Sequence, residues 1–354
     1  MINIEKEKNL APLTTFGVGG VARYFVEVFS EHTLSQAVDF AKQNRAPIFL
    51  LGGGSNILVS DAGFNGMVIQ NKIKGSKIDA RLGLVVSSAG EDWDRLVENC
   101  ITQKLAGVEC LSGIPGSVGG AVVQNIGAYG QTFGNVVARV RVFDTRTKKF
   151  KELDRSQCGF EYRNSLFKQN IGRFIIISVM FKLKPGGAPN TSYQDLKEIF
   201  GDRVPSLSEV RDSVLEIRAG KGMVINPKYE SYKSAGSFFR NPVIDQNLFD
   251  RIRPELEQGS PSKPWFWPAE HNKIKISAAY LIGKAGFPKG YKEENVGISP
   301  KQNLAIINRG EATASEIYNF AQKIKRSVLE RFGVELVEEV IFVGEFVDGG
   351  ALSA

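Results

Sequence analysis

Ser237 is the first residue whose position suggests chemistry. It lies in the stretch SAGSFFRNP, Ser234 to Pro242, where it follows a glycine and precedes two phenylalanines and an arginine. A serine in a glycine-flanked loop usually satisfies a neighbouring backbone group. The alternative is a hydroxyl that is held at a reaction centre. On these residues alone, the first interpretation is favoured.

An arginine and a pair of acids are further candidates. Arg163 stands between aromatic residues in FEYRNSLF, where a guanidinium could hold a carboxylate through two parallel hydrogen bonds, although a salt bridge at a domain edge is the more frequent role. Glu338 and Glu339 lie in the apolar closing stretch LVEEVIFVG, both faces of which are expected to be buried. A carboxyl group in such surroundings must be paired or neutral. Either acid could therefore be catalytic or belong to an ion-pair network, and the spacing does not decide which of them faces a site.

Two glycine segments could bind an anion. In FLLGGGSNIL, three glycines directly follow an apolar strand, and consecutive backbone N–H groups could converge there on a phosphate. The dinucleotide fingerprint GxGxxG is not met, because no helix is expected to follow, and a tight hairpin is the alternative. The second segment, SGIPGSVGGAVVQNIGAYG, holds six glycines and no charged residue.

A long uncharged loop like the second segment is costly to order unless something fills it. An extended diphosphate held by backbone N–H groups would do so, whereas a buried packing segment is the alternative. Two such loops without a Rossmann fingerprint suggest a flavin dinucleotide held by a non-Rossmann α+β domain.

Composition narrows the possible functions. The chain has 354 residues, enough for two or three domains, and its 42% hydrophobic and 23% charged residues are typical of soluble globular proteins. The net charge of +7 favours small anionic ligands, but Lys and Arg are scattered among acids, so we expect no nucleic-acid binding. The longest apolar run, 174–181, falls far short of the roughly 20 residues that a membrane span needs, and it is typical of a buried strand.

Histidine and cysteine are scarce. The histidines are His32 and His271, so we expect neither a metal site nor a Ser-His-Asp triad. Three cysteines without a CxxC motif, and an N-terminus without an apolar signal core, predict a reduced cytoplasmic protein. The chemistry must therefore depend on other groups or on a cofactor.

Hydrophobic periodicity and capping signals predict the elements that would position these residues. A βαβ unit is expected from a strand, a helix and the strand before the first glycine segment. Near the other end of the chain, Thr313 and Glu316 have the spacing of a capping box for a helix that ends at Gly333. The expected strands cover 20–30, 46–60 (interrupted by the first glycine segment), 136–153, 173–184 and 334–344, and the expected helices cover 31–44, 92–104, 206–221 and 313–333.

The motifs TTFGVGG, LGGGSN, SGIPGSVGGAVVQNIGAYG, YRNSLFK and AGSFFRNP, followed by the closing Glu-rich strand, occur in this order along the chain. In this it resembles the UDP-N-acetylenolpyruvoylglucosamine reductase family, also called UDP-N-acetylmuramate dehydrogenases, of the longer-chain type. The resemblance covers essentially the whole chain. It implies an α+β fold with two domains. The PCMH-type FAD-binding domain has two subdomains, one at 1–70 and one at 71–220, and 334–354 return to the second of them. The C-terminal α+β substrate-binding domain covers 221–333.

The resemblance also implies a cytoplasmic enzyme of peptidoglycan precursor synthesis. We expect a monomer, although the sequence itself does not give the oligomeric state. NADPH would reduce a non-covalently bound FAD, and the flavin would reduce the enolpyruvyl double bond of the UDP-sugar substrate to give UDP-N-acetylmuramate. Because the cofactor supplies the hydride, histidine is not needed. By this resemblance Arg163 and a protonated Glu339, kept neutral by apolar neighbours, stabilise the enolate, and Ser237 protonates the adjacent carbon. The phenylalanines after Ser237 would then wall the site against water.

Further site residues come from the same resemblance. The implied FAD contacts are Gly52, Gly53, Gly54, Ser55, Asn56, Ile114, Pro115, Gly116, Gly119, Gly120, Asn125, Gly127, Ala128, Tyr129 and Arg218. The implied substrate contacts are Tyr193, Lys221, Asn241 and Gln302.

The chain departs from the family pattern at two places. Glu338 stands where the family often has proline, and Ile341 stands where it often has a basic residue. The stretch SKPWFWPAEHN, with Trp265 and Trp267, stands where the longer type has a substrate-capping tyrosine, and the sequence does not decide which aromatic takes that role.

Two rival functions remain. One is another PCMH-type FAD-linked oxidase; many of these attach flavin through His or Cys, but His32 lies on a predicted helix away from both glycine segments. The other is a non-enzymatic module that binds nucleotides or cell-wall precursors, which would leave Ser237 and Glu339 without a task.

Overall fold

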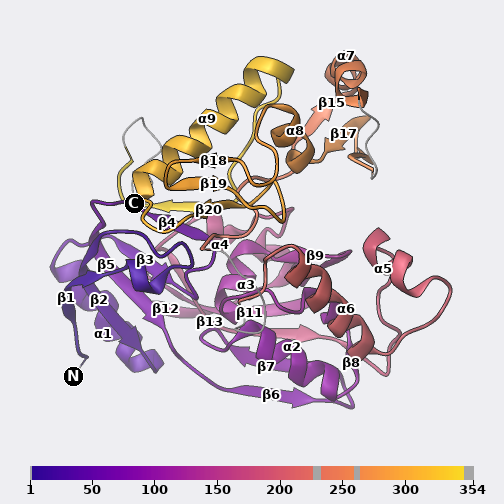
Figure 1. Ribbon diagram of the computed structural model, residues 1–354. Coiled ribbons are helices and arrows are strands. Elements are labelled where there is room, and N and C mark those ends of the chain that lie inside the picture. Colours follow the sequence, from indigo (N-terminus) through magenta and orange to yellow (C-terminus); the bar gives the residue numbers. More distant parts are fainter. Residues whose placement is uncertain (1, 226–232, 259–263, 347–354) are drawn as a thin grey trace.

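The computed structural model describes residues 2–225, 233–258 and 264–346. Three regions follow one another along the chain: an N-terminal sheet with one helix, a larger central sheet with helices, and a C-terminal α+β region above both (Figure 1). No helix among these residues is long and apolar enough to cross a bilayer.

The N-terminal sheet contains the expected βαβ unit. Helix α1 connects β2 to β3, and β5 lies between these two strands and parallel to both. The predicted helix is confirmed: Ser30 caps it, and its apolar stripe is buried with residues of the N-terminal sheet and of the central sheet. In sheet order, the elements are β1 (Glu5–Asn9), β2 (Val21–Val28), β5 (Phe64–Asn71) and β3 (Ile48–Leu51), with α1 (Glu31–Gln43).

The central sheet is antiparallel throughout and is covered on both faces. Its strand β13 is the apolar run in 174–181: Ile175 and Ile177 pack towards α1, whereas Ile176 packs towards α2 and α3. Burial on both faces explains why this strand shows no polar alternation. In sheet order, the strands are β12 (Lys149–Asp154), β11 (Val137–Asp144), β13 (Phe174–Lys182), β7 (Leu84–Ser88) and β6 (Ser76–Asp79).

Several helices and short strands surround this sheet. The helices are α2 (Trp93–Thr102), α3 (Val118–Gln124), α4 (Leu166–Gln169), α5 (Gln194–Phe200) and α6 (Leu207–Gly220). The short strands are β8 (Leu105–Ala106), β9 (Gly127–Ala128), β10 (Gln131–Thr132) and β14 (Lys184–Pro185).

The C-terminal region has two small sheets and its own core. Helix α9 begins at the predicted capping box of Thr313 and Glu316 and ends at Gly333, which adopts φ +67°. The helices are α7 (Gln246–Glu257), α8 (Ala278–Lys284) and α9 (Ala314–Phe332). The strands are β15 (Val243–Asp245), β17 (Lys273–Ile276) and β16 (Phe266–Ala269) in one sheet, and β18 (Lys292–Glu293), β19 (Val296–Ile298) and β20 (Ile306–Asn308) in the other.

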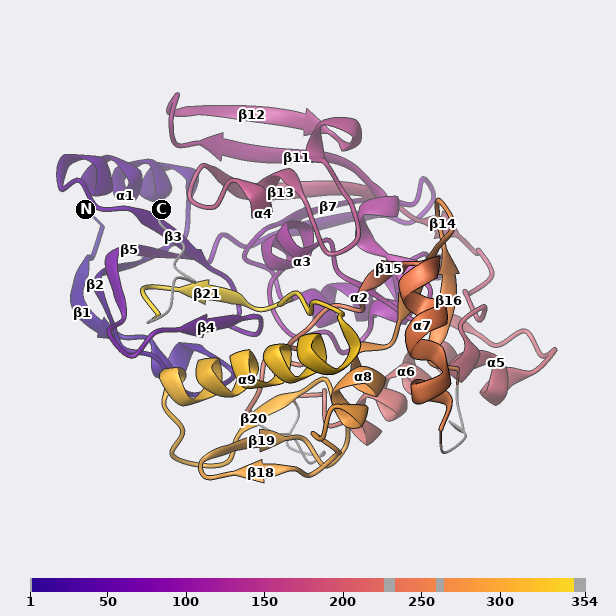
Figure 2. The ribbon, with the colours of Figure 1, turned by 90° about the horizontal axis from the view of Figure 1, so that it is seen from above.

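The closing segment differs from its prediction as a continuous buried strand. Only β21 (Ile341–Val343) is a strand, and it runs back to lie beside β4 (Ile57–Val59), which follows the first glycine segment (Figure 2). Glu338 forms an isolated bridge with Phe239, and Val337 is 50% exposed. One face of this segment is therefore open between the C-terminal core and β4.

The prediction of a loop for the whole second glycine segment was also wrong. Residues 118–124 form helix α3, despite the low helix propensity of two glycines in it. The Ser117 hydroxyl caps this helix, and Val118 and Val122 are fully buried against the central sheet. Tertiary packing thus outweighs the local preference of the glycines.

Candidate functional site

A cavity of about 300 Å³ lies where the three regions meet. Both glycine segments, the stretch from Phe167 to Ile176, the loop before Phe238 and the closing segment contribute to its lining. Ser237, Arg163 and Glu339 all line it, so the three catalytic candidates come from segments that are distant in sequence but share one cavity.

The two glycine segments touch each other at one wall of the cavity. A Cβ atom on Gly53 would lie 2.6 Å from the Cα of Gly116, and one on Gly52 would lie 2.9 Å from the Ser117 hydroxyl oxygen. The Ser55 hydroxyl also donates to the carbonyl of Pro115 at 3.1 Å. No side chain can be placed between these backbones. The wall therefore presents main chain to the cavity, as binding of an extended diphosphate requires.

The loop that carries Ser237 is fixed from both sides. The Phe238 amide donates to Leu304 at 2.8 Å, and the Phe238 carbonyl accepts from the Glu339 amide at 2.8 Å. Both Phe238 and Phe239 are fully buried in the C-terminal core and do not line the cavity. They anchor Ser237 rather than forming the expected wall against water.

Arg163 occupies an unusual backbone position. It lies in a tight turn closed by Glu161 and Asn164 and has φ +55°, a region that costs free energy for a residue with a side chain. Its Nη2 donates to the Gly127 carbonyl at 2.6 Å, and its Nε lies 2.8 Å from Glu339 Oε1. This turn aims the guanidinium at the acid instead of at solvent.

The surroundings of Glu339 are more polar than the apolar pattern of its strand predicted. Besides Arg163, the Gln124 Nε2 donates to Glu339 Oε1 at 3.1 Å, and the side chain is 15% exposed. Asn56 donates to the Glu339 carbonyl at 3.1 Å, so the first glycine segment also fixes this backbone. Glu338 instead pairs with Lys325 at 2.8 Å. The spacing could not separate the two acids, and the structure places only Glu339 in the cavity.

Most of the expected cofactor residues line the cavity. They are Gly52, Gly53, Gly54, Ser55, Asn56, Ile114, Pro115, Gly116, Gly119, Gly120, Gly127 and Arg218. Asn125, Ala128 and Tyr129 are not among its lining residues. The Asn125 amide group donates to Glu161 at 2.7 Å and accepts from Gly134 at 2.9 Å, so it supports the turn that carries Arg163.

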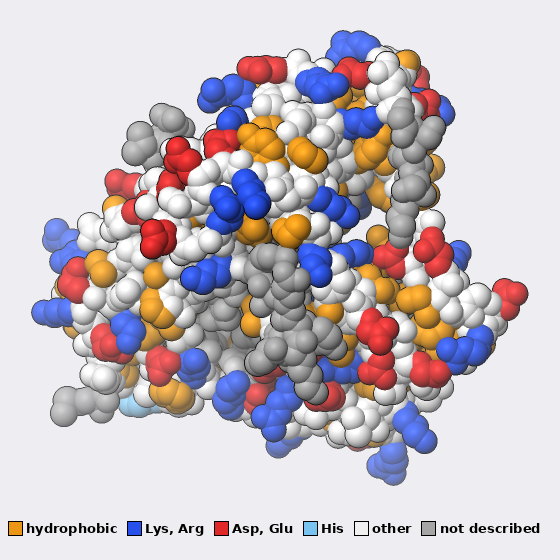
Figure 3. Space-filling model, viewed as in Figure 1, with side chains coloured by type: hydrophobic (Ala, Val, Ile, Leu, Met, Phe, Trp, Pro, Cys, Tyr) orange, Lys and Arg blue, Asp and Glu red, His pale blue; other side chains and the backbone are white. Residues whose placement is uncertain are grey.

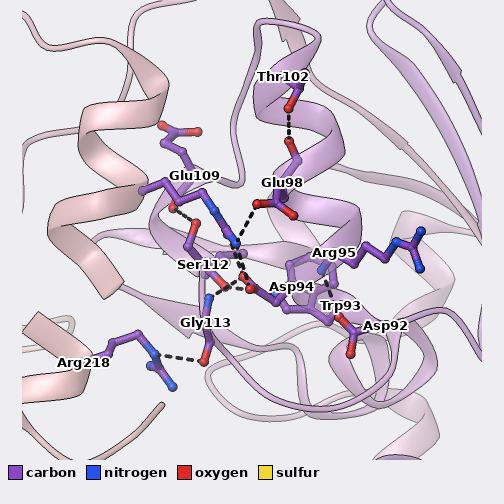
Figure 4. A network of polar contacts seen from close by, with 12 residues as sticks. Asp92, Trp93, Asp94, Arg95, Glu98, Thr102, Glu109, Ser112, Gly113 and Arg218 are labelled. Carbon is purple, nitrogen blue, oxygen red and sulfur yellow. Dashed lines mark hydrogen bonds and ion pairs between the residues drawn. The ribbon is translucent and has the colours of Figure 1, made fainter. Parts of the chain in front are cut away.

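Arg218 connects α6 to the start of the second glycine segment (Figure 4). Its Nε donates to the Gly113 carbonyl and its Nη2 to the Met223 carbonyl, both at 3.2 Å, and burial lowers its pKa. On the other side of the same glycine, Asp94 accepts from the Gly113 amide at 2.6 Å and pairs with Arg211 at 2.7 Å. Burial acts to raise the pKa of Asp94, but the hydrogen bonds from Arg211 and Gly113 outweigh it and lower the pKa overall.

The four expected substrate residues lie in two groups, and none of them is among the residues that line this cavity. Lys221 Nζ pairs with Asp195 at 3.0 Å and lies over the ring of Tyr129, which makes an edge contact with Tyr193. In the C-terminal region, Asn241 accepts from the Ala278 amide at 3.0 Å. Gln302 Nε2 is buried without a hydrogen-bond partner among the described residues.

The departures from the family pattern have clear places. Trp265 is buried and stacks on Tyr280, whereas Trp267 is 39% exposed. Ile341 lines the cavity, so an apolar side chain stands where the family often has a basic one.

On the face shown in Figure 3, basic and acidic side chains are interspersed rather than gathered in one stripe.

Sequence reasoning missed two residues beside Glu339. Gln124 lines the cavity, and Lys168 Nζ donates to its Oε1 at 2.7 Å. Burial lowers the pKa of Lys168 to about 8, and the charge of Arg240 adds to this shift. Lys168 lies in the quoted motif YRNSLFK, but nothing in the sequence indicated that it meets the second glycine segment.

Comparison with known proteins decides the family. Residues 22–150 match an FAD binding domain, and residues 227–343 match the C-terminal domain of UDP-N-acetylenolpyruvoylglucosamine reductase. A reductase of this name from Thermobifida fusca is 39% identical over 345 residues, which are 95% of this chain and 96% of that protein. The chain belongs to the UDP-N-acetylenolpyruvoylglucosamine reductase family.

Other members agree with this assignment. A reductase from Streptomyces coelicolor is also 39% identical, over 95% of this chain and 89% of that protein. The crystal structure of the Thermus caldophilus reductase superposes with a TM-score of 0.64 at 27% identity, covering 97% of this chain and 99% of that chain. The expected fold class, an FAD-binding domain followed by the C-terminal domain of this family, is confirmed.

The cavity fits FAD, the cofactor of the matched domain. The glycine contact at Gly53 and Gly116 presents backbone where a diphosphate would lie, and apolar side chains such as Phe174 and Ile175 line the cavity where flat rings would pack. Arg218 supplies a buried positive charge at the wall.

Proposed function

We propose that the chain catalyses the NADPH-dependent, FAD-mediated reduction of UDP-N-acetylglucosamine enolpyruvate to UDP-N-acetylmuramate in peptidoglycan precursor synthesis. One observation carries this proposal beyond family membership. Ser237, Arg163 and Glu339 line the same cavity as both glycine segments. FAD, when bound, supplies the electron pair that adds to the enolpyruvyl double bond.

Arg163 and Glu339 are suited to bind the carboxylate of the enolpyruvyl group. Arg163 is held by the Gly127 carbonyl and Glu339, so little rearrangement is needed when charge develops on the substrate. The contact with Glu339 also prevents the guanidinium from turning to solvent. Fixed donors of this kind stabilise the enolate more strongly than donors that must first be ordered.

Ser237 is suited to protonate the carbon beside that carboxylate. Its loop is joined to Glu339 through the Phe238 carbonyl, so the hydroxyl and the acid keep a fixed spacing. A serine hydroxyl is a weak acid, but the enolate carbon is far more basic, and the transfer is therefore downhill. Thr15 donates to the Ser234 carbonyl at 2.6 Å and so fixes the other end of the loop.

We propose that two pairs of residues bind the UDP-sugar: Lys221 and Tyr193 beside Tyr129, and Asn241 and Gln302 in the C-terminal region. The first pair already forms one cluster through Tyr129, and the unpartnered Gln302 Nε2 is a donor that a ligand oxygen could use. The basic net charge of +7 favours a diphosphate ligand. We expect the enzyme to be cytoplasmic and to work as a monomer. Light scattering of the purified protein would check the monomeric state.

An FAD-linked oxidase is the second candidate, because it would use the same kind of cofactor domain. Among the described lining residues of the cavity there is no histidine or cysteine, which favours non-covalent flavin. The purified protein should be yellow and release its flavin on denaturation. Without oxygen, NADPH alone should reduce the bound flavin once, and continued consumption of NADPH should require the enolpyruvyl substrate. A colourless protein, or continued NADPH consumption that is independent of the substrate under these conditions, would contradict the proposal.

A further inference from the structure

Four side chains form a continuous polar chain beside the cavity. Lys168 Nζ donates to Gln124 Oε1 at 2.7 Å, and Gln124 Nε2 donates to Glu339 Oε1 at 3.1 Å. Arg163 Nε reaches the same carboxylate oxygen at 2.8 Å. Gln124, Arg163 and Glu339 line the cavity, whereas Lys168 is not among its lining residues. Lys168 therefore reaches the carboxyl group of Glu339 through Gln124.

Lys168 decides which end of the Gln124 amide faces Glu339. An ammonium group can only donate, so it selects the carbonyl oxygen of the amide and leaves the NH₂ group for the acid. Its other contacts hold it in place, because Nζ also approaches the Glu339 carbonyl at 3.3 Å and the Arg163 carbonyl at 3.4 Å. The Ser165 hydroxyl, which caps α4, donates to Val123 at 2.6 Å and fixes this short helix against α3.

Because one carboxyl oxygen of Glu339 is occupied, a ligand must bind the other. Glu339 Oε1 takes both side-chain contacts that the described residues make to this carboxyl group, so Oε2 is the oxygen left for a ligand. A proton on a neutral Glu339 would also lie on Oε2, because Oε1 already accepts from Gln124 and lies against the Arg163 guanidinium. If Gln124 turned over, its carbonyl oxygen would face Oε1 and compete for that proton.

We propose that Lys168 is a positioning residue for the reduction: through Gln124 it keeps Glu339 Oε1 occupied and directs Oε2 towards the carboxylate of the substrate. This inference rests on the proposed function. A merely structural lysine would affect folding and flavin retention. A positioning lysine also affects the binding of a carboxylate ligand and the step in which substrate reoxidises the flavin.

The buried position of Lys168 gives the proposal a pH signature. The groups that act on its charge are Arg240 and Arg163, which disfavour the ammonium form, and Glu339, which favours it. Burial is the largest cause, and the pKa is lowered to about 8. Above that pH the neutral amine can also accept a hydrogen bond, so Gln124 is free to turn over. Substrate reduction should therefore slow above about pH 8 in the unaltered protein.

The test compares holoenzyme variants Lys168→Met, Lys168→Arg, Gln124→Leu and the Lys168→Met/Gln124→Leu double variant, with Lys77→Met at an exposed site as the control. Stopped-flow absorbance measures flavin reduction by NADPH and reoxidation by substrate separately. Calorimetry measures binding of UDP-N-acetylmuramate. We expect Lys168→Met to slow flavin reoxidation by substrate about tenfold and to weaken product binding about tenfold. The rate of flavin reduction by NADPH should stay within about twofold of that of the unaltered protein. The decline of substrate reduction above about pH 8 should be lost. Lys168→Arg should behave nearly as the unaltered protein.

The double variant should lose less than the sum of the two single losses, because both changes break the same path to the Glu339 carboxyl group. Lys168→Met alone also removes the contacts of Nζ to the Glu339 and Arg163 carbonyls. Additive losses, or product binding by Lys168→Met equal to that of the control, would overturn the positioning role. If Lys168→Met does not fold, Gln124→Glu is the second test. This variant preserves the shape of the side chain and the contact to Lys168, but its carboxylate cannot donate to Glu339. Unimpaired flavin reoxidation by Gln124→Glu would equally overturn the positioning role of Lys168. Failure of the unaltered holoenzyme to reduce the substrate would instead contradict the proposed function.

Discussion

Replacing Gly53 by alanine should push apart the two glycine segments that line the cavity. The added Cβ would lie 2.6 Å from the Cα of Gly116, whereas ordinary carbon contacts are about 3.5–4.0 Å. The obstacle is backbone, so it cannot turn aside as a side chain would. One segment must move by about 1 Å, against the Ser55 hydrogen bond to Pro115 that joins the two.

The magnitude follows from the cost of overpacking. Forcing an extra methyl group into a close-packed site costs about 1–3 kcal/mol, which corresponds to roughly a 5- to 150-fold change in a dissociation constant. We expect this loss to appear mainly in FAD affinity, because the displaced wall is the one that should hold the diphosphate. The assay is titration of the flavin-free protein with FAD, followed by flavin fluorescence, together with circular dichroism to verify folding.

Gly220→Ala is the matched control. A Cβ on Gly220 would meet no atom within 4 Å, and the residue is in helix α6, where alanine is favoured over glycine. This variant should bind FAD as the unaltered protein does. If folded Gly53→Ala also kept its FAD affinity within about twofold, the reasoning that the contact of the two glycine segments forms the cofactor wall would be refuted.

Three further predictions concern single side chains. Ser237→Ala should leave flavin reduction by NADPH nearly unchanged but slow reoxidation by substrate by orders of magnitude in stopped-flow absorbance; equal slowing of both steps would exclude the proton-donor role. Glu339→Gln should lose less steady-state activity than Glu339→Ala, because an amide can still donate, and equal losses would count against a donating role. Asp94→Asn should lower the free energy of unfolding in urea by about 1–3 kcal/mol at pH 7. The lowered pKa of Asp94 stabilises the fold above its ordinary unfolded value of about 4, and this contribution is lost as pH falls through the folded pKa, so the difference between the two proteins should shrink near pH 3.

Local signals in the sequence predicted much of the fold. The helix at 314–332 could be placed because Thr313, Glu316 and Gly333 are capping residues whose effect depends only on their immediate neighbours. Helix α1 likewise follows from a stripe of apolar residues with helical spacing. The apolar run at 174–181 was expected to be a buried strand and is one.

Contacts between distant segments could not be predicted in the same way. Helix α3 forms because Val118 and Val122 are buried by the central sheet, which no window around two glycines indicates. Glu339 was expected among apolar neighbours, but its partners Arg163 and Gln124 lie far away in sequence. The resemblance pointed to Ser237, Arg163 and Glu339, which line one cavity in the structure. The path through Lys168 depends on contacts between segments that are distant in sequence.

The most direct test of the central claim is the identity of the product. Purified holoenzyme is incubated without oxygen with NADPH and UDP-N-acetylglucosamine enolpyruvate, and the nucleotide product is analysed by mass spectrometry. We expect loss of NADPH in equal amount to the formation of a product that is heavier than the substrate by two hydrogen atoms and matches UDP-N-acetylmuramate. Unchanged substrate in the presence of a flavin that NADPH does reduce would contradict it.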